Sequence, residues 1–143
     1  MKHASPPRRP TALIQLLLVT GLLAVVGGLG LVLRADGRWL RLPLELLEET
    51  PFTSYLIPGL VLAVVVGGTQ LAAGVAAWKL RPGHLRLAAM AAAVLGIWIA
   101  AQALILGAVI WLQPLFFLVA VVELMMVGAA VPRKTGAAHR KSR

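Results

Sequence analysis

The sequence predicts an all-α protein, a bundle of four transmembrane helices. Hydrophobic residues make up 59 % of its 143 residues and charged residues only 13 %, against about 45–50 % and 25 % in soluble domains. A soluble fold of this length could not bury so much apolar surface, so we expect lipid to surround the chain. Four nearly uncharged stretches, each close to the roughly 20 residues that a membrane-spanning helix needs, set the number of helices.

The first two spans are expected at residues 11–33 and 55–78. The first is longer than the apolar stretch of a signal peptide, about 7–15 residues, and no small-residue cleavage site follows it, so we expect it to be retained. Pro58 falls in the first turn of the second span, where a backbone N–H has no helical partner to lose. An Arg-Pro-Gly sequence at residues 81–83 then predicts a turn.

The remaining apolar sequence contains a single charge, that of Glu123. It is too long for one span and suits two. We expect helices over 87–106 and 114–131, because Pro114 is well placed in the first turn of a helix. A short uncharged turn at residues 107–113 joins them on the outer side.

The distribution of basic residues predicts that both termini are cytoplasmic. Three precede the first span in segment 1–10, three lie in connector 79–86 and five follow the last span in segment 132–143. With four spans, all of these share one side, and only the three arginines of connector 34–54 lie on the other. Because positive charge is enriched in cytoplasmic loops, we expect a multi-pass plasma-membrane protein. Its basic tails would attract anionic lipid headgroups.

The outer connector is also acidic. It holds four of the five carboxylates of the chain, Asp36, Glu45, Glu48 and Glu49. Leucines alternate with the glutamates after Pro43, which predicts a short amphipathic helix along the membrane surface. We interpret the segment as an amphipathic connector, and an acidic lip that captures a ligand is the alternative.

Three groups of motifs resemble a known group of proteins. They are Pro51-Phe52 with YLIPG at 55–59, GIWIAAQ at 96–102, and WLQP at 111–114. Over about 21–127 the sequence resembles a group of uncharacterised small bacterial four-helix integral membrane proteins. The resemblance implies a fold and a compartment, and it carries over no catalytic residue.

Glu123 is the most informative single residue, because it lies about halfway along the last span. An acid at the bilayer centre costs about 2.5–3.5 kcal/mol on insertion scales. We therefore expect it to face the bundle and to bond to Gln70, or to Thr69 or Thr20 at a similar depth. The favoured interpretation is a protonated acid that joins helices through hydrogen bonds worth about 0.6–2 kcal/mol. A proton or cation site is the alternative, although no intramembrane base accompanies the acid.

A second candidate site gathers aromatic and amide side chains toward the outer leaflet. Trp98 and Gln102 are four residues apart and so share a helix face. In the four-span arrangement the cluster comprises Phe52, Tyr55, Trp98, Gln102, Trp111 and Gln113. The favoured interpretation is that these residues pack the outer loop onto the bundle, and the alternative is a binding site.

Small residues at four-residue steps predict close contacts between helices in lipid. In the second span these are Gly68, Ala72 and Ala76, and in the third they are Ala88, Ala92, Gly96 and Ala100. Such stripes suit contacts within the bundle, a homo-oligomer or a membrane-protein partner equally well.

Motifs for catalysis are missing from the sequence. There is no nucleotide-binding loop, nucleophile elbow or zinc-protease motif, and there is no cysteine. The three histidines are scattered among the cytoplasmic segments, which predicts no metal site and no Ser–His pair. No basic face alternates with aromatic residues, so we expect no nucleic-acid partner. We also expect no cofactor. The predicted function is a non-enzymatic accessory or scaffold subunit, and the alternative is a small proton- or cation-coupled transporter that uses Glu123.

Overall fold

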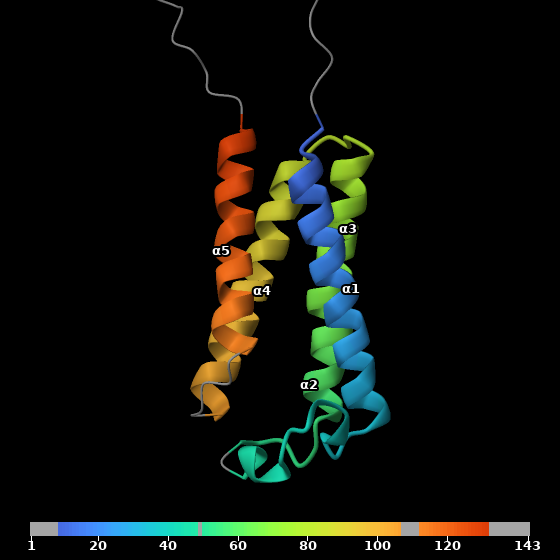
Figure 1. Cartoon of the computed structure of the whole chain (residues 1–143), viewed down its shortest axis with the longest axis vertical. Coiled ribbons are helices and arrows are strands. Elements are labelled where there is room, and N and C mark those ends of the chain that lie inside the picture. Colours follow the sequence, from blue (N-terminus) through green and yellow to red (C-terminus); the bar gives the residue numbers. More distant parts are fainter. Residues whose placement is uncertain (1–8, 49, 107–111, 132–143) are drawn as a thin grey trace, which may run out of the picture.

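The structure, a computed structural model, describes residues 9–48, 50–106 and 112–131. Every regular element in these residues is helical, and four helices are long and apolar enough to cross a membrane. They are α1 (Thr11–Leu33), the continuous span Leu56–Trp78, α4 (His84–Leu106) and α5 (Leu112–Ala130). Successive spans run antiparallel, so α1 begins and α5 ends at the same end of the bundle (Figure 1). We call this the terminal end and the opposite end the loop end.

The first span matches its predicted bounds, and the last two begin earlier than predicted. α4 begins at His84 instead of Leu87, because Gly83 (φ 79°) makes a left-handed turn directly before it and its carbonyl accepts the Arg86 N–H at 2.9 Å. Arg86 therefore lies in the first turn of the helix and not in the connector. α5 begins at Leu112, because a proline in the first turn of a helix interrupts no hydrogen bond.

The second span has three parts: α2 (Leu56–Leu60), the π-helix η3 (Val61–Gly67) and α3 (Gly68–Trp78). A π-helix holds more residues per turn than an α-helix and is rare, occurring mostly as single-turn bulges inside α-helices. It shifts the faces of the two flanking α-helical parts relative to each other.

The backbone of α1 lies in close contact with the backbone of the second span. A Cβ added to Gly28 would lie 2.5 Å from the Ala63 nitrogen and 2.5 Å from the Gly59 oxygen. A Cβ on Gly59 would lie 2.8 Å from the Gly28 oxygen, and Cβ atoms on Gly67 and Gly74 would meet side chains of α1 at 2.6 and 2.7 Å. This close approach is how helices gain packing energy in lipid, where the hydrophobic effect between them is missing.

The π-helix explains which glycines face α1. Gly67 and Gly74 are seven residues apart, the spacing that returns to one face of an α-helix. Gly59 and Gly67 are eight apart and still share that face, since η3 accommodates the extra residue. Two residues of the predicted stripe, Gly68 and Ala72, are exposed and therefore do not serve contacts within the bundle.

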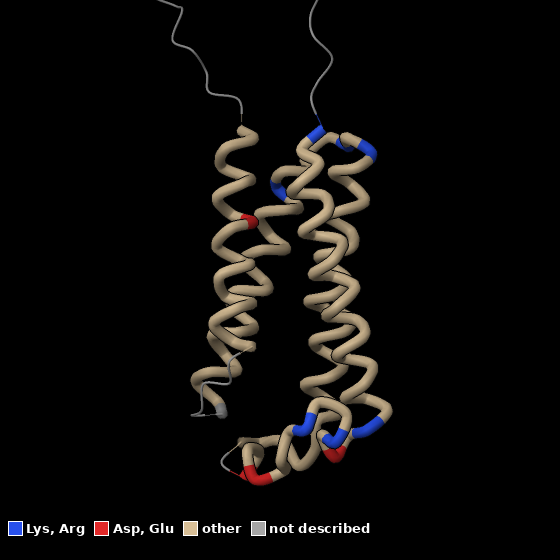
Figure 2. Tube along the Cα trace, in the orientation of Figure 1, with Lys and Arg blue, Asp and Glu red and all other residues tan. Residues whose placement is uncertain are grey.

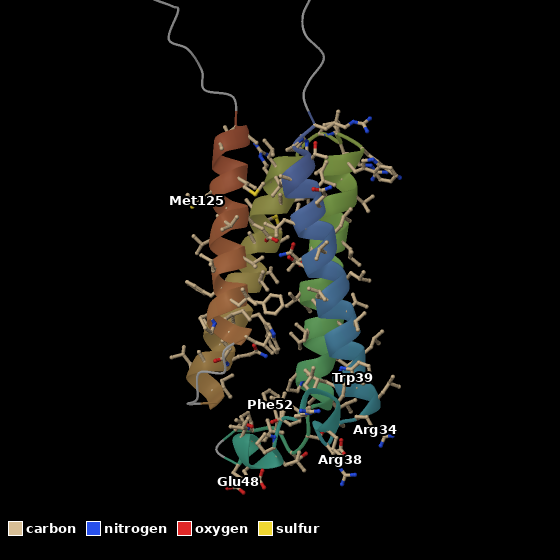
Figure 3. All side chains as sticks on the ribbon, viewed as in Figure 1. Arg34, Arg38, Trp39, Glu48, Phe52 and Met125 are labelled. Atoms are coloured by element: carbon tan, nitrogen blue, oxygen red, sulfur yellow. The ribbon has the colours of Figure 1, made fainter. Side chains whose placement is uncertain are left out.

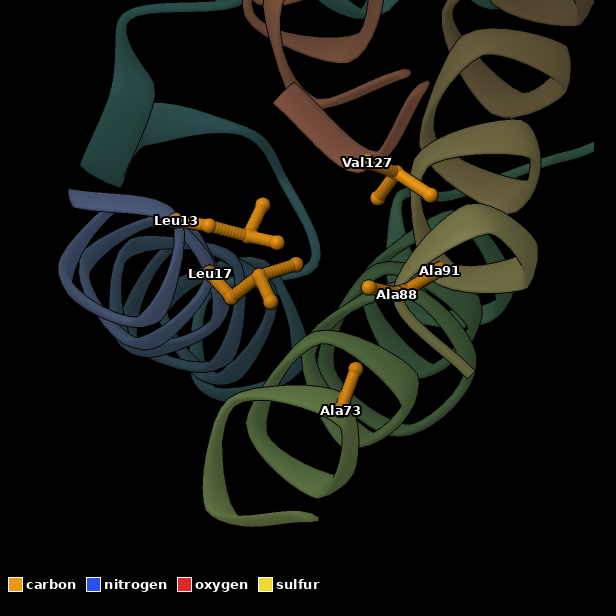
Figure 4. Packing of buried hydrophobic residues seen from close by; sticks show 6 residues of the cluster. All are labelled: Leu13, Leu17, Ala73, Ala88, Ala91 and Val127. Carbon is orange, nitrogen blue, oxygen red and sulfur yellow. The ribbon is translucent and has the colours of Figure 1, made fainter. Parts of the chain in front are cut away.

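The bundle is closed at the terminal end by a core of small and branched side chains. Its members, seen from close by in Figure 4, are Leu13, Leu17, Ala73, Ala88, Ala91 and Val127. Three alanines bring α3 and α4 close together there. Toward the loop end, the pair formed by α1 and the second span diverges from the pair α4–α5 (Figure 1).

Charges lie at the two ends of the bundle, with one exception. Figure 2 shows lysines, arginines and acids grouped at the ends and one acidic position along α5, which the sequence identifies as Glu123. At the loop end, the 3-10 helices η1 (Arg38–Leu40) and η2 (Leu44–Leu47) cross beneath the bundle. η2 follows Pro43 and buries Leu47, as expected of a short amphipathic segment.

Candidate functional site

A buried acid–amide pair joins α5 to α3. Glu123 and Gln70 are both 0 % exposed, and Gln70 Nε2 donates a hydrogen bond to Glu123 Oε2 at 2.9 Å. The contact predicted from depth along the spans is therefore present. Glu123 is seven residues from the end of α5 at Ala130, or about 10 Å at 1.5 Å per residue. It thus lies nearer the terminal end than the predicted halfway point.

The two threonines predicted at this depth behave differently. Thr20 of α1 is 3 % exposed and its hydroxyl faces the Glu123 carboxyl. Thr69 instead donates to the carbonyls of Val65 and Val66 in its own span, at 2.7 and 3.0 Å. Such bonds back to the preceding turn are an ordinary alternative for a helical threonine. The polar cluster is therefore Glu123, Gln70 and Thr20, and Thr69 is not part of it.

The pair leaves two acceptors unsatisfied. Within the described residues, Gln70 Oε1 and Glu123 Oε1 have no hydrogen-bond partner. An unpaired buried acceptor costs about 1–3 kcal/mol. A proton on Glu123 would convert one carboxylate oxygen into a donor. The cluster is chemically suited to hold a proton, as a protonated acid that joins helices and a proton site both require.

A cavity of about 410 Å³ lies between the two helix pairs. Its wall comes from α1, the outer loop, α2, η3, α4 and α5, and is made mostly of leucine, isoleucine, valine and aromatic side chains. Thr20, which faces Glu123, also lines the cavity. Leu23, Val26 and Ile105 line it and are exposed, so the cavity is not sealed along α1 and α4.

The predicted outer-leaflet cluster lies on this cavity. Its described members that line the wall are Phe52, Tyr55, Trp98, Gln102 and Gln113, and Trp111 lies outside the described residues. The structure thus brings residues from the loop, α4 and α5 around one space. The cavity also connects the two predicted sites, because Thr20 of the buried polar cluster lines the same cavity.

Tyr55 fastens the outer loop to the bundle. Its side chain is 3 % exposed; its hydroxyl donates to the Pro43 carbonyl at 2.8 Å and its N–H donates to the Ala35 carbonyl at 2.9 Å. Burial raises the pKa of the Tyr55 phenol above its ordinary value, and the charge of Glu45 raises it further. Tyr55 therefore holds in place the part of the outer loop that lines the cavity.

Tyr55 is the single tyrosine of the chain, so its titration can be followed directly by phenolate absorbance. We expect a midpoint above the ordinary value of about 10 in the folded protein and close to it after denaturation. Because the folded state favours the neutral phenol, its contribution to stability is complete below pH 10 and is lost as the pH rises through the folded pKa. A folded midpoint at or below the denatured one would contradict the burial of this phenol.

Sequence reasoning missed the role of Trp39. Trp39 lines the cavity and packs on Gly30, where an added Cβ would lie 2.6 Å from the indole ring. Figure 3 shows Trp39 and Phe52 at the loop end of the bundle, whereas Met125 on α5 points outward, away from the bundle. The only signal in the sequence was the Gly-Gly-Leu-Gly stretch at residues 27–30, where a glycine permits a ring to lie on the helix.

The fold and the cavity define a class: a multi-pass helical membrane protein with a largely apolar cavity beneath a structured loop. No protein-family model, no curated protein and no solved structure matches this chain.

Proposed function

We propose that the protein is a non-enzymatic accessory subunit that binds an apolar molecule or segment within the membrane. The observation that carries this proposal is the cavity between the helix pairs. Its volume falls in the range of about 300–1,000 Å³ typical of ligand pockets, which are mostly apolar with a few polar groups that orient the occupant. Because the cavity is not sealed along α1 and α4, such an occupant would have a route from the lipid that avoids water.

The proposal includes a location and an orientation. We place the chain in a bacterial plasma membrane, in the group of small four-helix proteins that its motifs resemble, with the loop end outside. The asymmetry of lysine and arginine supports this orientation. Because the chain has no cysteine, Thr53→Cys at the loop end and Lys79→Cys at the terminal end can be labelled separately in intact cells. A membrane-impermeant thiol reagent should reach only the first, and the reverse pattern would overturn the orientation.

Native mass spectrometry of protein extracted in mild detergent from its own membrane tests the binding function. We expect a reproducible complex, either with another protein or with a retained apolar molecule. Ala101→Phe, which enlarges a side chain on the cavity wall, should reduce that complex. Ala72→Phe, on an exposed face of α3, should leave it intact. A bare chain or homodimer in every preparation would contradict the proposal.

A second candidate is a small proton- or cation-coupled transporter that uses Glu123. It is favoured by one observation: the cavity extends to Thr20, whose hydroxyl faces the Glu123 carboxyl. The closed core at the terminal end, where Leu13 and Leu17 are at most 1 % exposed, would then have to open during transport. This requirement makes the transporter the second choice.

A further inference from the structure

A second pocket adjoins the mouth of the cavity at the loop end. It has a volume of about 580 Å³, and four of its seven lining residues also line the cavity: Trp39, Leu40, Leu42 and Leu112. The two spaces therefore share a wall.

Among the described residues that line this second pocket, Arg41 is the single charged one. It directly follows η1, in the left-handed conformation with φ 54°, and its N–H donates to the Arg38 carbonyl at 3.3 Å. Among the described residues, the one ion pair of the loop joins Arg38 to Asp36 at 3.1 Å, and Arg41 has no carboxylate at that range. An unpaired guanidinium beside an apolar cavity presents five donors to an anion.

We propose that the two pockets together bind a single-chain anionic amphiphile, with its chain in the cavity and its headgroup on Arg41. This inference rests on the proposed binding function and adds the chemical class of the occupant. The apolar wall suits a hydrocarbon chain, and the guanidinium suits a carboxylate, which it can hold by two parallel hydrogen bonds. The modest volume of the cavity favours one chain over the two of a phospholipid.

The access route fits an occupant that comes from the bilayer. Leu23, Val26 and Ile105 line the cavity, are exposed and belong to two of the apolar spans, so a hydrocarbon chain that resides in the bilayer can reach the cavity there. Arg41 lies at the loop end, where an anionic headgroup would remain near water. The occupant can therefore enter sideways without taking its charge through the hydrocarbon.

A brominated fatty acid provides a direct probe, because bromine quenches the fluorescence of an indole that it touches. Trp39 and Trp98 line the cavity, whereas Trp78 ends α3 at the terminal end of the bundle and is 55 % exposed. We would titrate the full chain carrying Trp78→Phe in detergent with this probe. Quenching should saturate, and the unbrominated acid should reverse it, which separates a site from partition into the micelle.

Two arginine variants and one neutral ligand test the headgroup assignment. Arg41→Gln should weaken binding of the acid about tenfold. Arg34→Gln should change it less than twofold, because Arg34 is exposed and lines neither pocket. Figure 3 shows Arg34 and Arg38 pointing away from the bundle. The corresponding brominated alcohol should bind more weakly than the acid and should not respond to Arg41→Gln.

The outcomes separate this inference from the function on which it rests. Saturable binding of acid and alcohol with equal affinity, or equal effects of Arg34→Gln and Arg41→Gln, would overturn the anionic occupant while leaving apolar binding intact. A two-chain anionic phospholipid that binds saturably, and that displaces the brominated acid at a lower concentration than the unbrominated fatty acid does, would overturn the assignment of a single-chain occupant. Quenching that neither saturates nor reverses would overturn both the inference and binding in this cavity.

Discussion

Replacing Gly28 with alanine should lower the free energy of unfolding by about 3 kcal/mol, the upper end of the usual cost of overpacking. The added Cβ would lie 2.5 Å from the backbone of Ala63 and of Gly59. Backbone atoms cannot rotate away as the end of a side chain can, so α1 and the second span must move apart. That movement weakens the other glycine contacts between α1 and the second span.

Two neighbouring positions give matched controls for this substitution. A Cβ on Gly27 would meet only Leu62 Cδ2, at the ordinary distance of 3.8 Å, and one on Gly68 would meet nothing within 4 Å. Gly27→Ala and Gly68→Ala should therefore be neutral or stabilise by up to about 1 kcal/mol through helix propensity. Unfolding by a denaturing detergent in mixed micelles measures all three. Equal stability of the three variants would show that α1 and the second span do not meet at Gly28.

Separating Glu123 from Gln70 should give the second large effect. Gln70→Leu leaves Glu123 without its 2.9 Å hydrogen bond, and Glu123→Leu leaves Gln70 with only a 3.5 Å contact to the Ala91 carbonyl. Each single change should cost about 1–3 kcal/mol, because it isolates a buried polar group. The double variant should cost less than the sum of the two, with a coupling energy of about 0.6–1.7 kcal/mol.

The same unfolding assay measures this cycle, and Thr69→Val is its control. Thr69 donates only within its own span, so its replacement should change stability by less than about 0.5 kcal/mol. Strict additivity of the Glu123 and Gln70 variants would contradict a direct interaction between α3 and α5.

Glu123→Gln distinguishes the two interpretations of this pair. The amide keeps an oxygen that accepts from Gln70 Nε2, so stability should change by less than about 1 kcal/mol. A structural pair therefore survives the change. A proton-coupled activity would be lost, since glutamine cannot exchange a proton, and a flux assay in proteoliposomes measures this loss. Unchanged flux in a protein that does move protons would exclude Glu123 as the carrier.

The helical spans could be predicted from the sequence more fully than the candidate site could. The all-helical class and the four helices that can cross a membrane follow from composition and from the length of apolar runs. Depth along the spans predicted that Glu123 would meet Gln70, Thr69 or Thr20, because polar groups at one level of a bilayer find each other, but it did not predict which of the three. The outer cluster was predicted as a set of residues, and the cavity that these residues share was not.

The chain's own sequence determined what depends on position along the helices: the number of long apolar helices, the grouping of charges near their ends and the approximate level of the buried polar groups. The tertiary structure decided what depends on rotation about the helix axes. Thr69 and Gln70 share a depth yet lie about 100° apart around the helix, and only Gln70 reaches Glu123. Likewise, the π-helix turned Gly67 toward α1 and Gly68 away from it. The rotation of each helix about its axis is set by all of its contacts with neighbouring helices together. A local pattern of residues therefore does not predict it.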